Sequence, residues 1–312
     1  MGQDQVDQER REFLKQIAAL GLLAGTAPLW VLPKELWAMA PKDAVPQPIL
    51  AKAEGTNWGQ LAGDAVQKLG GMKKFVNPGE VVVVKPNMAW DRAPELGANS
   101  HPAVVRKVVE LCLEAGAKKV KVIERPALSS RNAFEYSGIK AAVEGIRDSR
   151  VTVEYTDDRR FIDLTLDRFK GFKGYSFYKD IMEADRFINI PVVKTHSRTG
   201  VTACLKNMIG PTGGFRPNLH PKIDDAIADL NLVYRPDLHV VDATRIMVKN
   251  GPTGGREDDV VVKNLVFAGT DPVALDAIGT TLFGLKPADI GHIVKAHQSG
   301  RGEMDLAKIK FL

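Results

Sequence analysis

The chain has 312 residues, of which 44% are hydrophobic, so it is long enough to bury the core of one large domain or two small ones. Its formal net charge of +5 favours acidic partners, but 43 Lys and Arg residues are scattered among 38 Asp and Glu residues without an arginine-rich tract, and we expect no nucleic-acid partner. The only two cysteines, Cys112 and Cys204, are too few for a four-cysteine zinc or iron–sulfur site within this chain.

The first forty residues have the pattern of an export signal. Arg10-Arg11 precedes a mildly apolar run at 17–32, and residues 38–40 (Ala-Met-Ala) provide a small-x-small cleavage pattern. The segment resembles a twin-arginine signal, with Glu9 standing where Ser or Thr is usual. We therefore expect residues 1–40 to be a signal segment and residues 41–312 to be a single exported α/β domain.

This interpretation predicts a periplasmic protein whose partner during export is the twin-arginine machinery. Pro28 and Pro33 keep the apolar run short of the roughly twenty residues that a membrane span needs, so we expect membrane contact only through the signal segment, if it stays uncleaved. The twin-arginine route exports folded proteins that often carry a cofactor. It therefore favours a bound cofactor, such as a divalent metal, without proving one.

From residue 48 onward the pattern predicts strands and helices in alternation. Predicted strands lie at 49–53, 81–84, 120–123, 151–155, 187–193, 238–241 and 260–267. Predicted helices lie at 58–69, 101–115 (capped by Ser100), 132–145, 221–233, 273–283 and 287–296. The less regular stretch 161–178 indicates an antiparallel excursion. The four consecutive valines at 81–84 are typical of a strand buried on both faces, so we expect a mostly parallel sheet with helices on both faces, in three layers.

Charged residues stand at or just after the predicted strand ends. They are Lys85, Glu124, Lys194, Asp242 and, at the start of a helix, Asp271. A single charge at a strand end is more often a solvated edge. Ligands of open α/β sheets, however, bind outside the carboxyl ends of the strands, and five charged ends together predict a site there.

The residue types at this edge suit a small anion. Lys85, Lys194 and Lys206 supply positive charge, while Asn87 and Asn207 supply directional donors for a carboxylate or phosphate. Two residues after Lys194, His196 is a candidate for transferring a proton or binding a metal, and the alternative is an ordinary loop histidine. We take His196 and Lys194 as the candidate catalytic residues.

A five-residue repeat, Gly-Pro-Thr-Gly-Gly, occurs at 210–214 and again at 251–255. It matches neither the phosphate-binding loop nor the dinucleotide fingerprint. Either these are two ordinary turns, or their backbone amides bind an anion through Gly213, Gly214, Gly254 and Gly255.

Three acidic residues are candidate metal ligands: Glu124, Asp242 and Asp271. With His196 they offer the oxygen and nitrogen ligands of a divalent ion, but no two of them have the spacing of helical ligands. Asp271 precedes Pro272 and fits equally well as a helix cap. His101, in the first turn of a predicted helix, is open to a site role or a local one.

Five segments together resemble the "domain of unknown function 362" family. They are Lys85-Pro86-Asn87, Ser100-His101-Pro102, the turn at 115–120, the stretch 194–210 and the stretch 271–276. The resemblance covers nearly all of residues 48–285. It implies an α/β domain, joined in some members to ferredoxin-like segments with clustered cysteines that this chain lacks, and it implies no settled reaction.

The sequence thus predicts an exported enzyme that acts on a small anionic metabolite, with metal assistance optional. The alternative is a non-catalytic exported protein that binds a metal, a cofactor or a redox partner. The substrate and the oligomeric state remain open at this stage.

Overall fold

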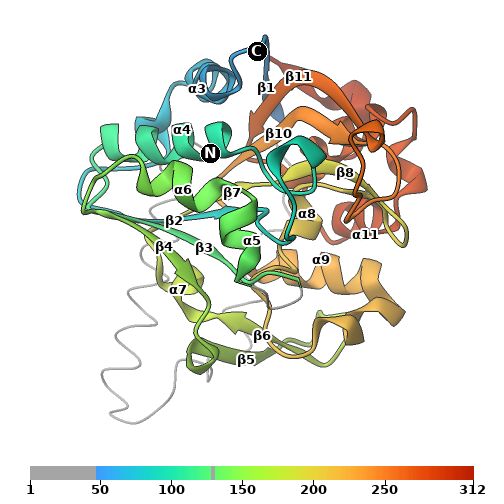
Figure 1. Cartoon of the computed structure of the whole chain (residues 1–312). Coiled ribbons are helices and arrows are strands. Elements are labelled where there is room, and N and C mark those ends of the chain that lie inside the picture. The colour runs from blue at the N-terminus through green and yellow to red at the C-terminus, as the bar shows by residue number, and fades with distance from the viewer. Residues whose placement is uncertain (1–46, 128–130) are drawn as a thin grey trace, which may run out of the picture. The chain divides into compact units, whose positions relative to one another are not determined.

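A computed structural model of the chain describes residues 47–127 and 131–312, which belong to one compact unit spanning Val45–Leu312 (Figure 1). The predicted signal segment at 1–40 and its boundary lie outside the described residues. Among the residues that are described, no helix has both the length and the apolar character needed to cross a bilayer.

A ten-stranded sheet runs through the centre of this unit. Eight strands follow the order β12-β1-β11-β10-β7-β2-β3-β4, while β8 pairs with β10, and β9 pairs with β8. The ten strands are β1 (Ile49–Glu54), β2 (Val81–Pro86), β3 (Lys119–Glu124), β4 (Val151–Tyr155), β7 (Arg186–Ile190), β8 (Val192–His196), β9 (Gly200–Thr202), β10 (Leu238–Met247), β11 (Val260–Gly269) and β12 (Lys310–Phe311). A separate antiparallel pair, β5 (Phe161–Thr165) and β6 (Gly174–Tyr178), accounts for the irregular stretch predicted at 161–178.

The strands from β4 through β3, β2 and β7 to β10 pair in parallel, and β8 also pairs in parallel with β10. Pairing is antiparallel where β11 joins β10 and β1, and where β9 joins β8. The prediction of a mostly parallel α/β sheet is therefore confirmed. Its carboxyl edge is formed by the ends of β2, β3, β4, β7 and β8, whereas β11 ends at the opposite edge.

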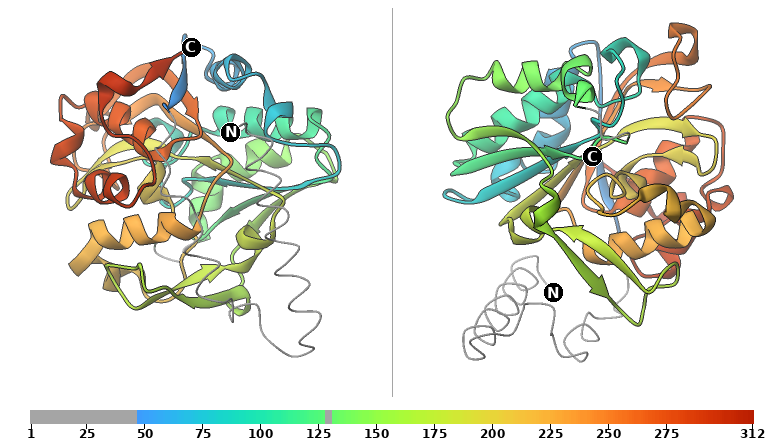
Figure 2. Two further views of the ribbon diagram at one scale, coloured as in Figure 1. Left: turned by 180° about the vertical axis from the view of Figure 1, so that it is seen from behind. Right: turned by 60° about the horizontal axis from the view of Figure 1, so that its bottom comes forward.

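Helices cover both faces of the sheet (Figures 1 and 2). Alternate strand residues face two separate sides: Val82 and Val84 join one core, while Val83 joins another. On the first side lie α3 (Trp58–Lys68), α4 (Pro102–Glu114) and α6 (Ile139–Glu144). On the second side lie α9 (Ile223–Val233), α10 (Pro272–Thr281) and α11 (Gly291–Gln298), together with the β5–β6 pair. The described residues also form three short helices: α5 (Asn132–Tyr136), α7 (Lys179–Glu183) and α8 (Cys204–Asn207).

Several element boundaries differ from the prediction. The strand expected at 187–193 is divided into β7 and β8 at Pro191, because proline has no N–H to continue a ladder of hydrogen bonds. The helix expected at 132–145 is interrupted at Gly138 and forms α5 and α6. The strand expected to end at Asp242 continues to Met247, so Asp242 lies inside β10.

The cap of α4 also differs from the prediction. His101 takes this place, with its Nδ1 accepting a hydrogen bond from the N–H of Ala103 at 3.2 Å. Ser100 is buried and tied to neighbouring strands, since its hydroxyl donates to Ile190 O and accepts from the N–H of Asn87. The structure thus gives His101 a local role in starting the helix.

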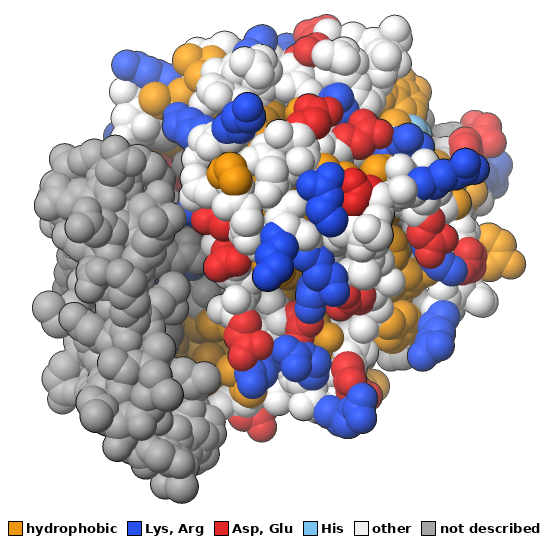
Figure 3. Space-filling view, turned by 90° about the vertical axis from the view of Figure 1, so that its left-hand side faces the viewer, with side chains coloured by type: hydrophobic (Ala, Val, Ile, Leu, Met, Phe, Trp, Pro, Cys, Tyr) orange, Lys and Arg blue, Asp and Glu red, His pale blue; other side chains and the backbone are white. Residues whose placement is uncertain are grey.

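The face of the molecule opposite α11 carries both signs of charge in close mixture (Figure 3). Lys and Arg side chains are interspersed there with Asp and Glu side chains. No large patch of one sign of charge is seen among the described residues of this face.

Candidate functional site

A buried ion pair joins the ends of β2 and β3. Lys85 Nζ donates hydrogen bonds to Glu124 Oε2 at 2.9 Å, to Asn207 Oδ1 at 3.0 Å and to Pro86 O at 2.8 Å. The other carboxylate oxygen of Glu124 accepts from the N–H of Arg125 at 2.8 Å. Both side chains are at most 1% exposed. The charge of Lys85 is therefore compensated by Glu124.

A ladder of amide side chains extends from this pair toward β8. Lys194 Nζ donates to Asn87 Oδ1 at 3.0 Å, and Asn87 Nδ2 donates to Asn207 Oδ1 at 2.9 Å. Asn207 Nδ2 donates in turn to Asn189 Oδ1 at 2.8 Å, and Asn189 contacts Nδ1 of the buried His239. The structure thus brings Lys194 and the two predicted asparagines into one network with Lys85.

Sequence reasoning missed Asn189 and His239 as members of the network. Both lie in strands that read as apolar runs, Phe-Ile-Asn-Ile and Leu-His-Val-Val. A polar residue inside such a run was the available signal, because a buried polar side chain needs a hydrogen-bond partner.

Lys194 and Lys206 form no ion pair with any carboxylate among the described residues, and this distinguishes them from Lys85. Burial lowers the pKa of Lys194 well below its usual value, and the charge of Lys206 lowers it further. Burial, followed by the charge of Arg216, lowers the pKa of Lys206 to about 8. Lys206 also makes no hydrogen bond through its amine to any described residue. Both amines therefore lie in this region without a directly paired carboxylate among the described residues.

His196, the last residue of β8, lies close enough to the two lysines for their charges to affect it. Burial, then Lys206 and Lys194, lowers the pKa of His196 to about 3, so the ring is neutral at physiological pH. Its Nδ1 accepts a hydrogen bond from the N–H of Arg198 at 3.1 Å, which places the ring hydrogen on Nε2. His196 is thus a hydrogen-bond donor in this arrangement rather than a ready base.

The first glycine of each Gly-Pro-Thr-Gly-Gly repeat packs against the network. A Cβ on Gly210 would lie 2.5 Å from Glu124 Oε1 and 2.8 Å from Lys85 Nζ. A Cβ on Gly251 would collide with the carbonyl of Thr195, between Lys194 and His196 in β8. Both repeats therefore need glycine at this place so that the turns can approach the site closely.

The glycines that we expected to bind an anion are only partly available for it. Gly213 already donates its N–H to Ser176 O at 2.9 Å, and Gly254 donates to Asn250 O at 3.0 Å. The other two glycines are exposed: Gly214 and Gly255. The structure therefore leaves only the latter two as candidates.

Asp242, a predicted metal ligand, is buried and bound by protein donors. Its Oδ1 accepts from the N–H and hydroxyl of Thr244, and its Oδ2 accepts from the N–H of His101 at 2.6 Å. Arg245 lies 3.5 Å from the same carboxylate. Asp242 thus stabilises the start of α4 against β10.

Asp271 lies at the other edge of the sheet because β11 runs antiparallel to its neighbour. It caps α10 by accepting from the N–H of Ala274 at 2.9 Å, as the alternative interpretation proposed. Within residues 47–127 and 131–312, no group of three or more His, Cys, Asp or Glu side chains is placed to hold a metal ion. The set Glu124, Asp242 and Asp271 is therefore not assembled, since each carboxylate has separate partners.

Asp276, the last residue of the stretch 271–276, was given no role from the sequence, and in the structure it orients α8. Its two carboxylate oxygens accept from the N–H groups of Cys204 at 2.6 Å and Leu205 at 3.1 Å. Burial raises the pKa of Asp276 to about 7. Since α8 carries Lys206 and Asn207, this acid fixes the turn that brings both to the site. Cys204 is fully buried, and burial raises the pKa of its thiol, so we assign it to the core.

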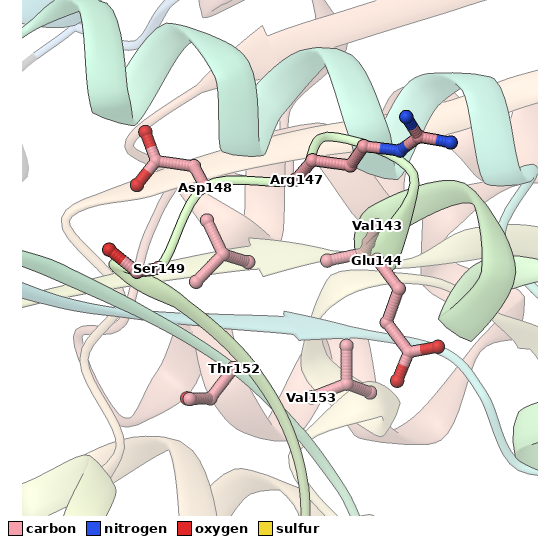
Figure 4. Close-up of a pocket in the computed structure, with 8 residues that line it drawn as sticks. Val143, Glu144, Arg147, Asp148, Ser149, Thr152 and Val153 are labelled. Atoms are coloured by element: carbon pink, nitrogen blue, oxygen red, sulfur yellow. The ribbon is translucent and has the colours of Figure 1, made fainter.

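A separate surface hollow of about 460 Å³ lies between α6 and β4, lined by Val143, Glu144, Arg147, Asp148, Ser149, Val151, Thr152 and Val153 (Figure 4). The charged ends of Arg147 and Asp148 point away from its centre. Asp148 is paired with Arg150. None of the network described above lines this hollow, so it is not the candidate site.

The sequence pattern of a domain of unknown function, DUF362, matches residues 82–281 of this chain. A thylakoid-associated protein of Synechocystis is 30% identical over 234 residues, which cover 72% of this chain and 70% of that protein. Two solved structures are less similar. A Thermotoga maritima protein has a TM-score of 0.43 and 11% identity, over 78% of this chain and 60% of that one. The lactate racemase apoprotein of Thermoanaerobacterium thermosaccharolyticum has a TM-score of 0.41 and 10% identity, over 75% and 57%. This chain thus spans less than two thirds of either structure. The domain match and the 30% identical relative show that the chain belongs to the DUF362 family.

Proposed function

We propose that this member of the family binds a small anion, a carboxylate or a phosphate, at Lys206, with Lys194 and His196 beside it. One observation carries the proposal: two lysines at the carboxyl edge have no carboxylate partner among the described residues. An ammonium group taken out of water is costly unless an opposite charge compensates it. A bound anion would supply that charge.

The other predicted residues support this site in a different way from the one expected. The side-chain amides of Asn87 and Asn207 form hydrogen bonds with each other and with Lys194 and Lys85. They therefore position the lysines rather than contact the ligand. The Nε2–H of His196 is the additional donor that the geometry supports. The ligand contacts we propose are therefore Lys206 and His196, with Lys194 behind them.

Lys206 supports an enzymatic role for this site. A lysine whose pKa is about 8 exchanges its proton near physiological pH, as a general acid or base must. We propose that the protein is an enzyme in which Lys206 both binds the anion and transfers a proton. In that case Lys206→Arg, which keeps the charge but does not titrate near neutral pH, should retain anion binding and lose turnover. If Lys206→Arg turns over substrate as fast as the wild type, Lys206 takes no part in the chemical step.

A non-catalytic binding protein is the second candidate, and the state of His196 favours it. A neutral ring whose Nδ1 is already hydrogen-bonded is suited to holding a ligand rather than to accepting a proton. Native mass spectrometry and elemental analysis of the purified protein separate the two candidates. A metal or cofactor that is retained, with no turnover of small carboxylates and phosphates, would favour the binding protein.

Calorimetric titration with phosphate and acetate tests the anion site itself. Lys206→Met should weaken binding at least about tenfold, because a charge-assisted contact contributes about 1.5–3 kcal/mol. Lys222→Met, at an exposed lysine just before α9, is the matched control and should bind like the wild type. If neither anion binds the wild type, or if both variants bind equally well, the proposal fails.

The cellular location is also a proposal. We infer from residues 1–40 that the chain is exported by the twin-arginine route to the periplasm and contacts a membrane only through that segment. A relative named as thylakoid-associated is compatible with a membrane-linked location. Replacing Arg10 and Arg11 by lysine should leave the protein in the cytoplasm, as cell fractionation would measure. Export that is unchanged would count against this route.

A further inference from the structure

A second group of cations lies next to the ends of β3 and β4. It consists of Arg125, Arg131 and Arg216, which we call the arginine group. In the part of the chain that the structure describes, none of the three forms an ion pair with a carboxylate. The nearby Lys121 differs, since it contacts Asp180 at 2.7 Å. The arginine group is therefore a second place of uncompensated positive charge on the same edge of the sheet.

Two members of the group are held in place by backbone carbonyls. Arg216 donates to Gly210 O at 2.9 Å and to Arg125 O at 2.7 Å. Arg125 donates to Thr212 O at 2.6 Å and to Gly214 O at 3.1 Å. These bonds tie the first Gly-Pro-Thr-Gly-Gly turn to the end of β3, so both guanidinium groups are fixed beside the site without neutralisation of their charge.

The hydroxyl of Tyr155, at the end of β4, is enclosed and has no hydrogen-bond partner among the described residues. Its ring stacks on Phe134, with the ring centroids 5.2 Å apart, and the guanidinium of Arg131 lies 5.4 Å from its centroid. The neighbouring Thr156 is 8% exposed, and its hydroxyl also lacks a partner in the described part of the chain. Enclosed hydroxyls normally have a partner, so two adjacent ones without a partner point to a group that the protein does not itself supply.

Electrostatics link this place to Lys206. The pKa of Tyr155 is raised by burial, while the charges of Arg131, Arg216 and Arg125 oppose that rise. Arg216 also lowers the pKa of Lys206. Arg216 thus acts on both the lysine at one end and the tyrosine at the other, so the two places belong to one electropositive region.

We propose that this edge binds a small molecule with two anionic groups, such as a dicarboxylate or a phosphorylated carboxylate. One group contacts Lys206, and the other contacts Arg125, Arg131 and the hydroxyl of Tyr155. Arg216 contributes its charge only, because its Nη1 and Nη2 already donate to the carbonyls of Arg125, Gly210, Pro126 and Ala127. This inference rests on the proposed anion site and goes beyond it by naming a second contact. Arg131 is exposed and makes no hydrogen bond or ion pair with another described residue, so its guanidinium donors are open to the second group.

The experiment compares acetate with the linear dicarboxylates from malonate to adipate by calorimetric titration. We expect one dicarboxylate length to bind at least about tenfold more tightly than acetate, because it adds a charge-assisted contact. Tyr155→Phe and Arg131→Gln should remove most of this advantage and leave acetate binding unchanged. Tyr136→Phe, at an exposed tyrosine of α5, is the matched control and should change neither.

The outcomes separate the two proposals. If acetate binds in a Lys206-dependent way but no dicarboxylate binds more tightly, the second contact is wrong and the anion site stands. The same holds if Tyr155→Phe weakens acetate and the dicarboxylates equally. If no probe binds, both proposals fail. Urea unfolding of each variant verifies that its fold is intact.

Discussion

The two edges of the parallel strands differ in whether carboxylates pair with their cations. At the amino edge, Arg186 begins β7 and is only 11% exposed. It contacts Glu80 at 2.9 Å and Asp237 at 3.3 Å, so two carboxylates surround one guanidinium. At the carboxyl edge, Lys206 and Lys194 have no such partner among the described residues.

This difference indicates which edge serves the fold and which serves a ligand. Nothing in the strand pattern requires the asymmetry, because the same strands contribute to both edges. Keeping a buried charge without a partner lowers stability, and proteins retain such arrangements mainly at functional sites. The carboxyl edge is also where open α/β sheets bind their ligands.

Removing the carboxylate that compensates Lys85 at the carboxyl edge should have the largest effect on stability. Glu124→Gln leaves the ammonium of Lys85 buried without a counter-ion, and we expect a loss of about 3–5 kcal/mol in the free energy of unfolding. Urea unfolding measures this loss. Glu80→Gln is the matched change at the amino edge, where Asp237 still pairs with Arg186, and it should cost about 1 kcal/mol or less. Equal losses for the two variants would contradict the contrast between the edges.

A change in pH should have an effect of intermediate size on the affinity for an anion. Only protonated Lys206 attracts an anion, and its pKa without ligand is about 8. Affinity for phosphate should therefore be highest below pH 8 and fall by up to about tenfold per unit above it, equivalent to about 1.4 kcal/mol. Calorimetry between about pH 8.5 and 10, where inorganic phosphate is almost entirely the dianion, tests this. Lys206→Arg should lack the fall, and a fall of the same size in that variant would assign the titration elsewhere.

Most of the fold could be predicted from the sequence because parallel strands buried on both faces appear as short apolar runs. The valine run that became β2 is such a case. The prediction was wrong where one residue overrides the pattern, as Pro191 does in dividing β7 from β8. It was also wrong for the direction of β11, because an apolar run does not show whether a strand is parallel to its neighbour. That error placed Asp271 at the wrong edge.

The candidate site was predictable in its charges and not in its pairings. Lys85, Asn87, Lys194 and Asn207 meet in one network, but the sequence does not show that Glu124 compensates Lys85 and leaves the other lysines without a partner. That distinction depends on distances between strands far apart in the chain. The role of Gly210 was equally hidden, because it depends on how closely the turn approaches Glu124.

The variant with the smallest expected change in stability best distinguishes an unpaired cation from a paired one. Lys206→Met should raise the free energy of unfolding by about 1 kcal/mol in the absence of anion, since it removes a half-buried charge that has no carboxylate partner among the described residues. Arg186→Met should lower it, because that change leaves Glu80 and Asp237 without their cation. Urea unfolding at pH 7 compares the two variants with the wild type.

The way in which protein stability changes with pH provides a control for the Lys206→Met comparison. The pKa of Lys206 in the folded protein is lowered to about 8, so the unfolded chain holds the proton more tightly. Wild-type stability should therefore rise as the pH increases from about 8 toward the pKa of the unfolded state, about 10.4. The advantage of Lys206→Met should be largest below pH 8 and shrink across this range. Saturating phosphate should also reduce it, because ligand binding stabilises only the protein that retains the site. An advantage that is independent of both pH and phosphate would mean that Lys206 is not an unpaired cation awaiting a ligand.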